Sequence, residues 1–312
     1  MPTRKSANPT SQSLSGCRSA QMSNFSAWIL ASRPKTLVAA LLPVIIGAAW
    51  AYGRQEFDWA VAGLILLSAT CIQIGTNFAN DYSDFKKGAD THERLGPTRV
   101  TQAGLLSPRA VFIGTVTVFA LAILFAIPLM LRGGWPILAI GLSGILFGWM
   151  YTGGPYPLGY NGLAEFFVLT YFGVLAVAGT SYLFTLEWTL LTFLLGLIPG
   201  ILACGLLAVN NVRDEQTDRK AGKRTPVVRF GRMFGKIEFA ASLFLPYLLL
   251  LALWQHLTTY AILLPLLALP LAFAPMSAVW TKADGPSLNR ALAQTARHML
   301  VFGLLLTIGL LL

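Results

Sequence analysis

Acidic residues are scarce in this chain, in which 13 Asp and Glu stand against 23 Lys and Arg among 312 residues. Histidine and cysteine are rarer still, with three of each. Neither type shows metal-ligand spacing and no Ser-His-Asp order is evident, so the sequence indicates neither a zinc centre nor a hydrolase triad. We expect all three cysteines to be reduced packing residues: Cys17, Cys71 and Cys204.

Two further ligand classes lack support. A nucleotide-binding P-loop needs Gly five residues before its Gly-Lys pair and Ser or Thr directly after the Lys. Around the segment AGKRT those positions hold Thr217 and Arg224. The formal net charge of +10 is compatible with nucleic-acid binding, but the basic residues lie in loops between apolar runs. We therefore expect no nucleic-acid partner.

Long apolar runs dominate the rest of the sequence. Hydrophobic residues make up 55% of the chain and the mean hydropathy is +0.64, which is too apolar for one soluble core. The runs are about 18 to 24 residues long, the length of a membrane-spanning helix and not of a barrel strand. We predict an all-α, polytopic membrane bundle of about nine transmembrane helices: 36–53, 59–79, 109–131, 135–152, 162–184, 188–209, 238–256, 259–281 and 296–312.

The basic residues predict how this bundle is oriented, because Lys and Arg are retained on the cytoplasmic side. With the N-terminus cytoplasmic and the C-terminus outside, 21 of the 23 Lys and Arg face the cytoplasm, and only Arg54 and Arg132 lie outside. Residues 1–24 are polar and read as a disordered cytoplasmic tail. No cleavable signal peptide is evident. We expect residues 25–312 to form one transmembrane domain, entered through an interfacial helix over 26–35.

Two clusters of acid and amide side chains stand where apolar runs meet long polar loops. On a helix, residues four apart share a face, so each cluster projects a column of oxygen atoms from the last turns. Like charges at this spacing repel each other, which suggests a bound cation, and hard oxygen ligands favour Mg²⁺. The first cluster is Asn77, Asn80, Asp81 and Asp84, and the second is Asn210, Asn211, Asp214 and Asp218.

Basic residues are interleaved with both clusters. Acids alone suit a bare cation and bases alone a bare anion, whereas the mixture suits a diphosphate shared between Mg²⁺ and Lys or Arg. A diphosphate at the mouth of an apolar bundle suggests an attached chain that prefers lipid, such as a polyprenyl diphosphate. A single acidic cluster of this kind is more often a solvated loop of a transporter. Two matched clusters on one side favour a functional site.

At these residues the chain resembles the UbiA superfamily of intramembrane aromatic prenyltransferases. Within it, the chain is most similar to the 1,4-dihydroxy-2-naphthoate polyprenyltransferase branch of menaquinone biosynthesis. The matching strings are RPKTL at 33–37, NDYSDFKKGAD at 80–90, GPTRVTQAGLLS at 96–107 and NNVRDEQTDRKAGKRTPVVRFG at 210–231. Where the common pattern has a third Asp the chain has Gly88, and its next acid is Asp90. Which acid completes the first metal site stays open.

The resemblance implies roles for individual residues. It carries over Asn77, Asp81, Asp84, Asp214 and Asp218 as the shell of Mg²⁺ and diphosphate. The other asparagines of the clusters are candidate substrate-binding residues, and so are five basic residues as diphosphate contacts: Arg33, Lys35, Arg99, Lys223 and Arg224. Tyr151, Tyr156 and Tyr160 are candidates for stacking on an allylic cation or aromatic acceptor, although interfacial tyrosines are more typical of membrane anchors.

The implied reaction is transfer of the polyprenyl group to 1,4-dihydroxy-2-naphthoate. Neutralised diphosphate leaves, an allylic cation forms, and the electron-rich ring attacks it with loss of CO₂. The resemblance also implies a bacterial inner membrane. Three alternatives stay open: another aromatic acceptor such as 4-hydroxybenzoate or homogentisate, a divalent-cation transporter, and a non-catalytic binder of lipid diphosphates. A transporter is disfavoured because Glu165 is the only acid placed within a span.

Overall fold

The computed structural model describes residues 23–88, 95–96, 98–256 and 259–312. Within these ranges the chain forms helices and loops and no strand, as predicted. The elements in chain order are α1 (Asn24–Ser32), α2 (Pro34–Gly53), α3 (Trp59–Lys86), α4 (Pro108–Gly133), α5 (Trp135–Met150), α6 (Ala164–Leu169), the π-helix η1 (Thr170–Val174), α7 (Leu175–Thr185), α8 (Leu190–Lys220), α9 (Pro226–Phe230), α10 (Arg232–Trp254), the 3₁₀-helix η2 (Tyr260–Ala268), α11 (Leu269–Thr281) and α12 (Gly285–Leu311).

Eight helical segments of the described chain are long and apolar enough to cross a membrane. Two of them are composite, α6 with η1 and α7, and η2 with α11. The shorter apolar helix α5 coincides with the remaining predicted span, 135–152. The predicted polytopic helical bundle is therefore confirmed.

Two helices extend well past their apolar runs. The predicted spans end at residues 79 and 209, whereas α3 continues to Lys86 and α8 to Lys220. Both acid-amide clusters therefore lie on the last helical turns. At the other extreme, α12 begins eleven residues before the predicted 296, because Asp284 caps it by accepting the backbone N–H of Ser287 at 2.8 Å.

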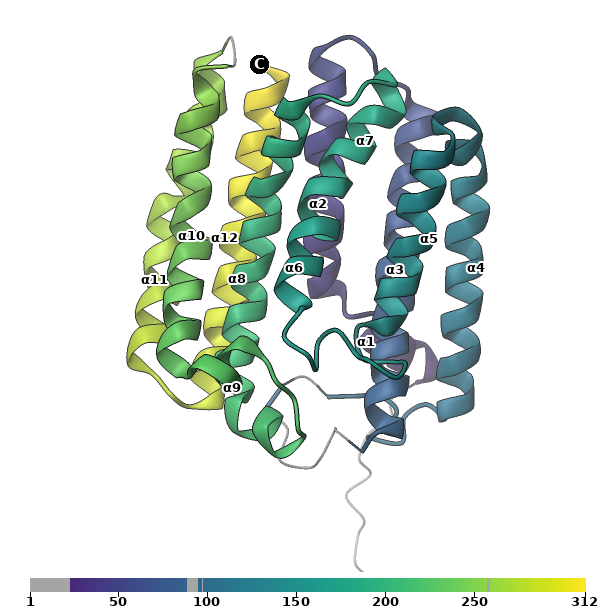
Figure 1. Cartoon of the computed structure of the whole chain (residues 1–312), viewed down its shortest axis with the longest axis vertical. Coiled ribbons are helices and arrows are strands. Elements are labelled where there is room, and N and C mark those ends of the chain that lie inside the picture. The colour runs from purple at the N-terminus through teal and green to yellow at the C-terminus, as the bar shows by residue number, and fades with distance from the viewer. Residues whose placement is uncertain (1–22, 89–94, 97, 257–258) are drawn as a thin grey trace, which may run out of the picture.

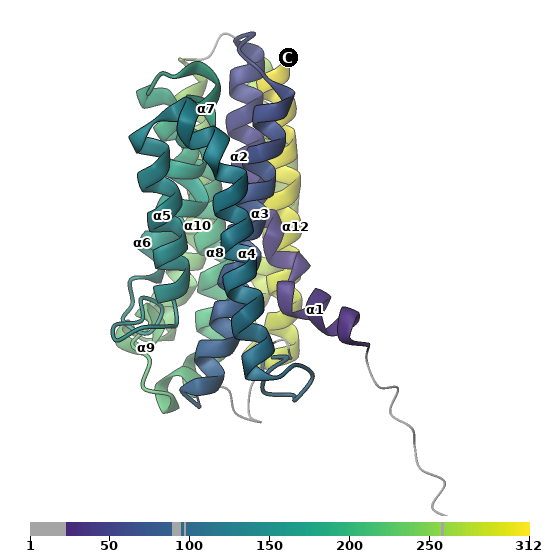
Figure 2. The same cartoon turned by 90° about the vertical axis from the view of Figure 1, so that its right-hand side faces the viewer.

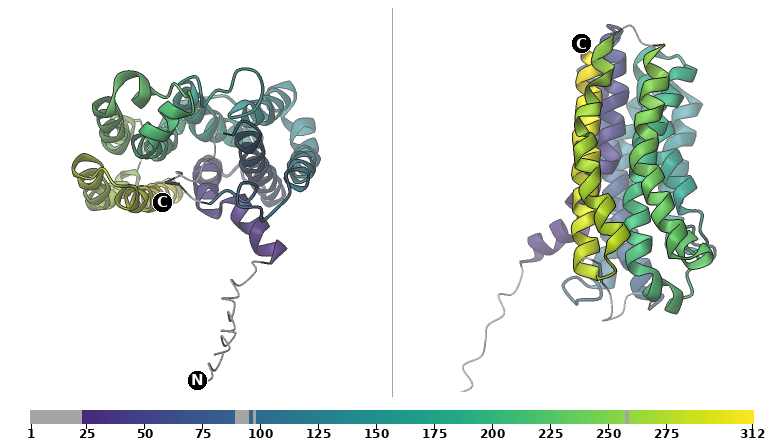
Figure 3. Two further views of the ribbon diagram at one scale, coloured as in Figure 1. Left: turned by 90° about the horizontal axis from the view of Figure 1, so that it is seen from below. Right: turned by 90° about the vertical axis from the view of Figure 1, so that its left-hand side faces the viewer.

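The bundle has two halves joined by α2. Helices α3, α4 and α5 form one half, and α8, α10, α11 and α12 form the other (Figure 1). Seen from below, α2 lies between them, and it contacts α3, α7, α8 and α12 (Figure 3). Helix α1 projects from the side of the bundle near its lower end, far from the C-terminus (Figure 2). The C-terminal ends of α3 and α8 both lie at the lower end (Figure 1).

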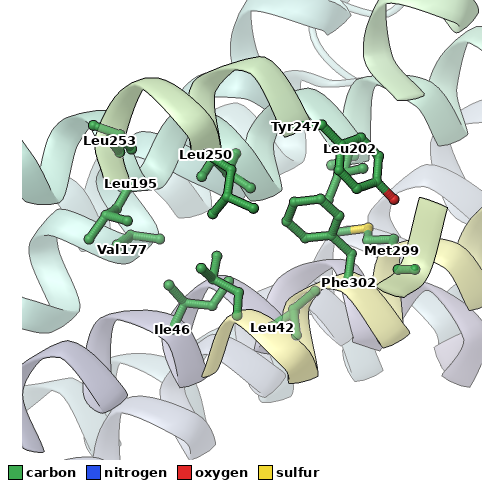
Figure 4. Close-up of a cluster of buried hydrophobic side chains, with 14 of the residues drawn as sticks. Leu42, Ile46, Val177, Leu195, Leu202, Tyr247, Leu250, Leu253, Met299 and Phe302 are labelled. Carbon is green, nitrogen blue, oxygen red and sulfur yellow. The ribbon is translucent and has the colours of Figure 1, made fainter. Parts of the chain in front are cut away.

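The largest apolar cluster lies where α2, α8, α10 and α12 meet. Its fully buried members include Leu42, Ile46, Leu202, Leu250 and Phe302 (Figure 4). In a bilayer such helices associate through close packing and not through removal of apolar surface from water, so small residues at the contacts matter. This core ties α2 to the half that contains α8.

Candidate functional site

Asn77 and Asp81, one turn apart on α3, hold neighbouring segments of the chain. The Asn77 amide donates to the carbonyl of Ser32 at 2.9 Å and to the hydroxyl of Thr36 at 3.0 Å. Both carboxylate oxygens of Asp81 accept backbone N–H groups, from Val100 at 3.1 Å and from Thr101 at 3.0 Å. Asp81 is buried, so these bonds tie the loop after α3 to the helix.

Asn80 and Asp84, also one turn apart, face the loop that follows α5. Asn80 accepts a hydrogen bond from the hydroxyl of Thr152 at 2.9 Å. Asp84 accepts one from the Tyr160 hydroxyl at 3.0 Å and forms an ion pair with Arg99 at 2.6 Å. The side chains of Asp84 and Arg99 are 3% and 7% exposed, so this ion pair is largely shielded from water.

The second cluster also pairs its acids with bases. The Arg213 guanidinium binds both oxygens of Asp214, at 2.8 and 2.6 Å, and donates to Asn289 of α12 at 2.8 Å. Asp218 forms an ion pair with Lys223 at 2.9 Å. Each of these carboxylates therefore lies beside a cation supplied by its own segment of chain.

Tyr160 connects the two clusters. The ammonium groups of Lys87 and Lys223 lie 5.0 and 5.1 Å from the centre of its ring, so they are no more than about 10 Å apart. Its hydroxyl donates to Asp84, and Lys223 in turn binds Asp218. A continuous series of contacts thus runs from the end of α3 to the end of α8. The two clusters therefore lie at the same end of the bundle.

The Lys87 ammonium contacts the loop that follows α5 and also lies over the ring of Tyr160. It donates to the carbonyl of Thr152 at 2.6 Å. Desolvation lowers the pKa of Lys87 from its usual value, and the negative charge of Asp84 opposes that change. Lys87 was not among the residues selected from the sequence, although it stands three residues after Asp84.

Glu165 forms a deeper polar contact at the start of α6. Its Oε1 accepts a hydrogen bond from the Asn211 amide at 2.9 Å. Glu165 was noted in the sequence only as an acid within a span, and nothing in the sequence linked it to Asn211.

The remaining candidates are less tightly connected. Arg33 adopts the left-handed conformation between α1 and α2, with φ of 50°. Arg224 is exposed and joins the site through its backbone N–H, which donates to the carbonyl of Tyr160 at 2.7 Å. Tyr156 is 53% exposed, as a membrane anchor would be. Asn210 is half-buried on α8. The side chain of Lys35 and all of Asp90 lie outside the described residues, as does most of the expected tail 1–24.

The donor set offers hard oxygen ligands, which suit a divalent cation such as Mg²⁺. In the part of the chain that the structure describes, no three His, Cys, Asp or Glu side chains gather closely enough to enclose an ion. Mg²⁺ rarely needs such a cage, because it usually takes one or two carboxylates and completes its shell with water and substrate phosphates. Asp84 on one side and Asp214 with Asp218 on the other meet that requirement.

Comparisons with known proteins agree with this arrangement. The family model described as "UbiA prenyltransferase family" matches residues 40–310. The chain is 36% identical to 1,4-dihydroxy-2-naphthoate octaprenyltransferase of Mycobacterium tuberculosis, covering 91% of this chain and 96% of that protein. It is 35% identical to the protein of the same name from Escherichia coli, covering 93% and 96%.

A solved structure shares the fold at low sequence identity. It is a UbiA homolog from Archaeoglobus fulgidus bound to GPP and Mg²⁺, with a TM-score of 0.63 and 17% identity, covering 91% of this chain and all of that one. The match to the family model and the identity to these relatives extend over nearly the whole bundle. The chain belongs to the UbiA prenyltransferase family.

Proposed function

We propose that the protein transfers a polyprenyl group from polyprenyl diphosphate to 1,4-dihydroxy-2-naphthoate, releasing diphosphate and CO₂ and giving demethylmenaquinol. The names of the relatives that match along nearly the full chain support this acceptor. The observation that carries the proposal is the series of contacts through Tyr160, which brings Asp84 and Asp218 to the same end of the bundle.

The acids Asp84, Asp214 and Asp218 are proposed to hold Mg²⁺, with the amide of Asn80 beside Asp84. Bound there, Mg²⁺ neutralises charge on the diphosphate and so makes it a better leaving group. Lys87 and Lys223 both lie over the Tyr160 ring and are the proposed cationic contacts of the diphosphate oxygens. Arg99 and Arg213 already pair with acids and orient those carboxylates.

This proposal gives Asp81 a structural role, whereas the sequence resemblance implied that it binds Mg²⁺ and diphosphate. Both of its oxygens already accept backbone N–H groups, so half of its acceptor sites are taken up in holding the loop. We assign Asp81 to holding the loop that carries Arg99, and Asn77 to joining α3 to the start of α2. Both residues act by positioning the site.

The reaction needs no protein nucleophile. The bond between the allylic carbon and the diphosphate oxygen breaks, and both electrons leave with the diphosphate. A ring carbon of the acceptor attacks the allylic carbon, and loss of CO₂ restores the aromatic ring. The apolar bundle keeps water from the cation. With basic residues retained inside, the site faces the cytoplasm and the proposed location is a bacterial inner membrane.

A product assay with matched variants tests the proposal. Purified protein receives Mg²⁺, radiolabelled polyprenyl diphosphate and, in turn, dihydroxynaphthoate, 4-hydroxybenzoate or homogentisate, and products are identified by mass. We expect prenylated naphthol and CO₂ with the first acceptor. Asp84→Asn is expected to lose at least about 100-fold in rate, as removal of a group that stabilises transition-state charge does.

The matched control is Asp58→Asn at the opposite end of α3. Asp58 caps the helix by accepting the N–H of Ala60 at 2.7 Å, and Asn caps equally well, so this variant keeps its activity. Product with another acceptor alone would reassign the substrate within the family. No product with any acceptor, together with Mg²⁺ uptake into vesicles, would point to a transporter and contradict the proposal.

A further inference from the structure

One oxygen of the Glu165 carboxyl group has no partner in the fold. Oε1 is held by the Asn211 amide at 2.9 Å. Oε2 is buried and makes no hydrogen bond within the described residues. A buried acceptor left in this condition costs free energy, because it has given up water without replacement. The orientation imposed by Asn211 thus presents an acceptor atom that a ligand can satisfy.

The position of this atom along the bundle indicates which ligand. Asn211 precedes Asp218 by seven residues on α8, which is two turns on the same face and about 10 Å deeper in the membrane. Because Asn211 holds Glu165, this carboxyl group lies at the face of α8 that also carries Asp218. If the proposed function holds, diphosphate lies at the level of Asp218, and Glu165 is beside the region where the allylic carbon meets the ring.

Of the groups that enter this region, one has the right chemistry. Diphosphate is an anion and is repelled by a carboxylate, and the prenyl chain carries no hydrogen-bond donor. The aromatic acceptor carries hydroxyl groups. Its 1-hydroxyl is adjacent to the acceptor's own carboxylate and bonds to it, whereas the 4-hydroxyl points away from that carboxylate and is free to donate.

We propose that Glu165, oriented by Asn211, accepts a hydrogen bond from the 4-hydroxyl of the aromatic acceptor and thereby sets the position of its ring against the allylic carbon. An acceptor that lacks this hydroxyl leaves the buried Glu165 oxygen without a partner. Glu165 therefore selects acceptors that carry a hydroxyl at this position.

The test compares two acceptors in two proteins. The value of kcat/KM is measured for 1,4-dihydroxy-2-naphthoate and for 1-hydroxy-2-naphthoate, which lacks the 4-hydroxyl, in the wild type and in Glu165→Gln. We expect the variant to lose about 10- to 100-fold with the dihydroxy acceptor and less than about threefold with the other. If the analogue binds without reacting, its inhibition constant against the dihydroxy acceptor replaces kcat/KM. The KM for polyprenyl diphosphate and the Mg²⁺ requirement stay unchanged.

Three further variants sharpen the result. Asn211→Ala leaves Glu165 without its orienting amide. We expect this variant to lose part of the preference for the dihydroxy acceptor over the acceptor that lacks the 4-hydroxyl. Glu187→Gln makes the same exchange at an exposed position between α7 and α8. It should leave kcat/KM unchanged for both acceptors. Glu238 of α10 also has a buried oxygen without a hydrogen bond among the described residues, so Glu238→Gln is included.

Several outcomes would overturn the assignment. Equal losses with both acceptors in Glu165→Gln would mean that Glu165 only supports the fold. A raised KM for polyprenyl diphosphate or a raised Mg²⁺ requirement would place it in the cation site. Loss of discrimination in Glu238→Gln but not in Glu165→Gln would transfer the role to α10. A wild-type protein that forms no product with dihydroxynaphthoate would instead refute the proposed function.

Discussion

Asp81 and Asp84 are three residues apart on α3, and yet their surroundings differ in kind. Asp81 is surrounded by backbone donors of the loop that it holds. Asp84 is surrounded by a guanidinium and a phenol, both of which are side chains that can move aside when a stronger partner arrives. An acid that must exchange partners during turnover is better served by the second environment. We therefore propose that Asp81 serves the structure and Asp84 the chemistry.

Replacing Asp81 tests this division at the residue scale. Asp81→Ala leaves two buried backbone N–H groups unpaired, each at a cost of about 1–3 kcal/mol, so the loop around Val100 should loosen. We expect faster proteolysis near this loop and a lower unfolding temperature, with the residual activity restored in part at low temperature. Asp81→Asn keeps one acceptor oxygen and should lose less. A stable Asp81→Ala protein with no activity would instead place Asp81 among the metal ligands.

The sequence identified the two clusters but not the partners of each member. Helical periodicity relates Asn77 to Asp81 and Asn80 to Asp84, but it does not say which pair meets the neighbouring loop. That choice depends on how α3 is rotated in the bundle, which long-range packing decides. Tyr160 was ranked as a membrane anchor because tyrosines near a membrane interface usually are anchors, and sequence spacing does not reveal that the ammonium groups of Lys87 and Lys223 lie over its ring.

At the scale of elements, the close approach of η1 to α8 positions the helix that carries the second cluster. A Cβ atom on Gly173 would lie 2.5 Å from the carbonyl oxygen of Gly196 and 2.6 Å from the Cα of Gly200. These are backbone atoms that cannot move aside singly. The absence of side chains here lets the two helices touch, as small residues do between membrane helices.

Gly173→Ala should therefore separate η1 from α8 and destabilise the protein by about 1–3 kcal/mol, the usual cost of overpacking. The unfolding temperature in detergent should fall, and the activity should fall with it as Asp214 and Asp218 move. Gly63→Ala is the control, because a Cβ on Gly63 meets nothing within 4 Å. Equal stability of the two variants would show that this contact does not position α8.

Hydropathy predicted the existence of these elements better than their ends. It locates apolar runs, so it found the middle of every span, but it missed the last turns of α3 and α8 and the first turns of α12. Those turns are polar and are helical because of caps such as Asp284 and because the helix continues into the loop. The missed turns of α3 and α8 are the ones that carry the site.

At the scale of the whole molecule, α1 and the C-terminus lie at opposite ends of the bundle (Figure 1). This agrees with an odd number of crossings, and the distribution of Lys and Arg predicts that the site end faces the cytoplasm. Single cysteines at Ala221 and Glu56, in a chain whose native cysteines are replaced, test that prediction. In intact cells an impermeant maleimide should label Glu56→Cys and spare Ala221→Cys until the membrane is opened. The reverse pattern would invert the topology.

The central claim is that the two clusters hold one Mg²⁺–diphosphate group between them. The most direct measurement is the Mg²⁺-dependent affinity for a prenyl thiodiphosphate, which resists ionisation, in the wild type, Asp84→Asn, Asp218→Asn and the double variant. If both acids serve one ligand, either single change removes most of the affinity, and the double variant loses at least about 1 kcal/mol less than the sum. Strictly additive losses, or full affinity in either single variant, would contradict the claim.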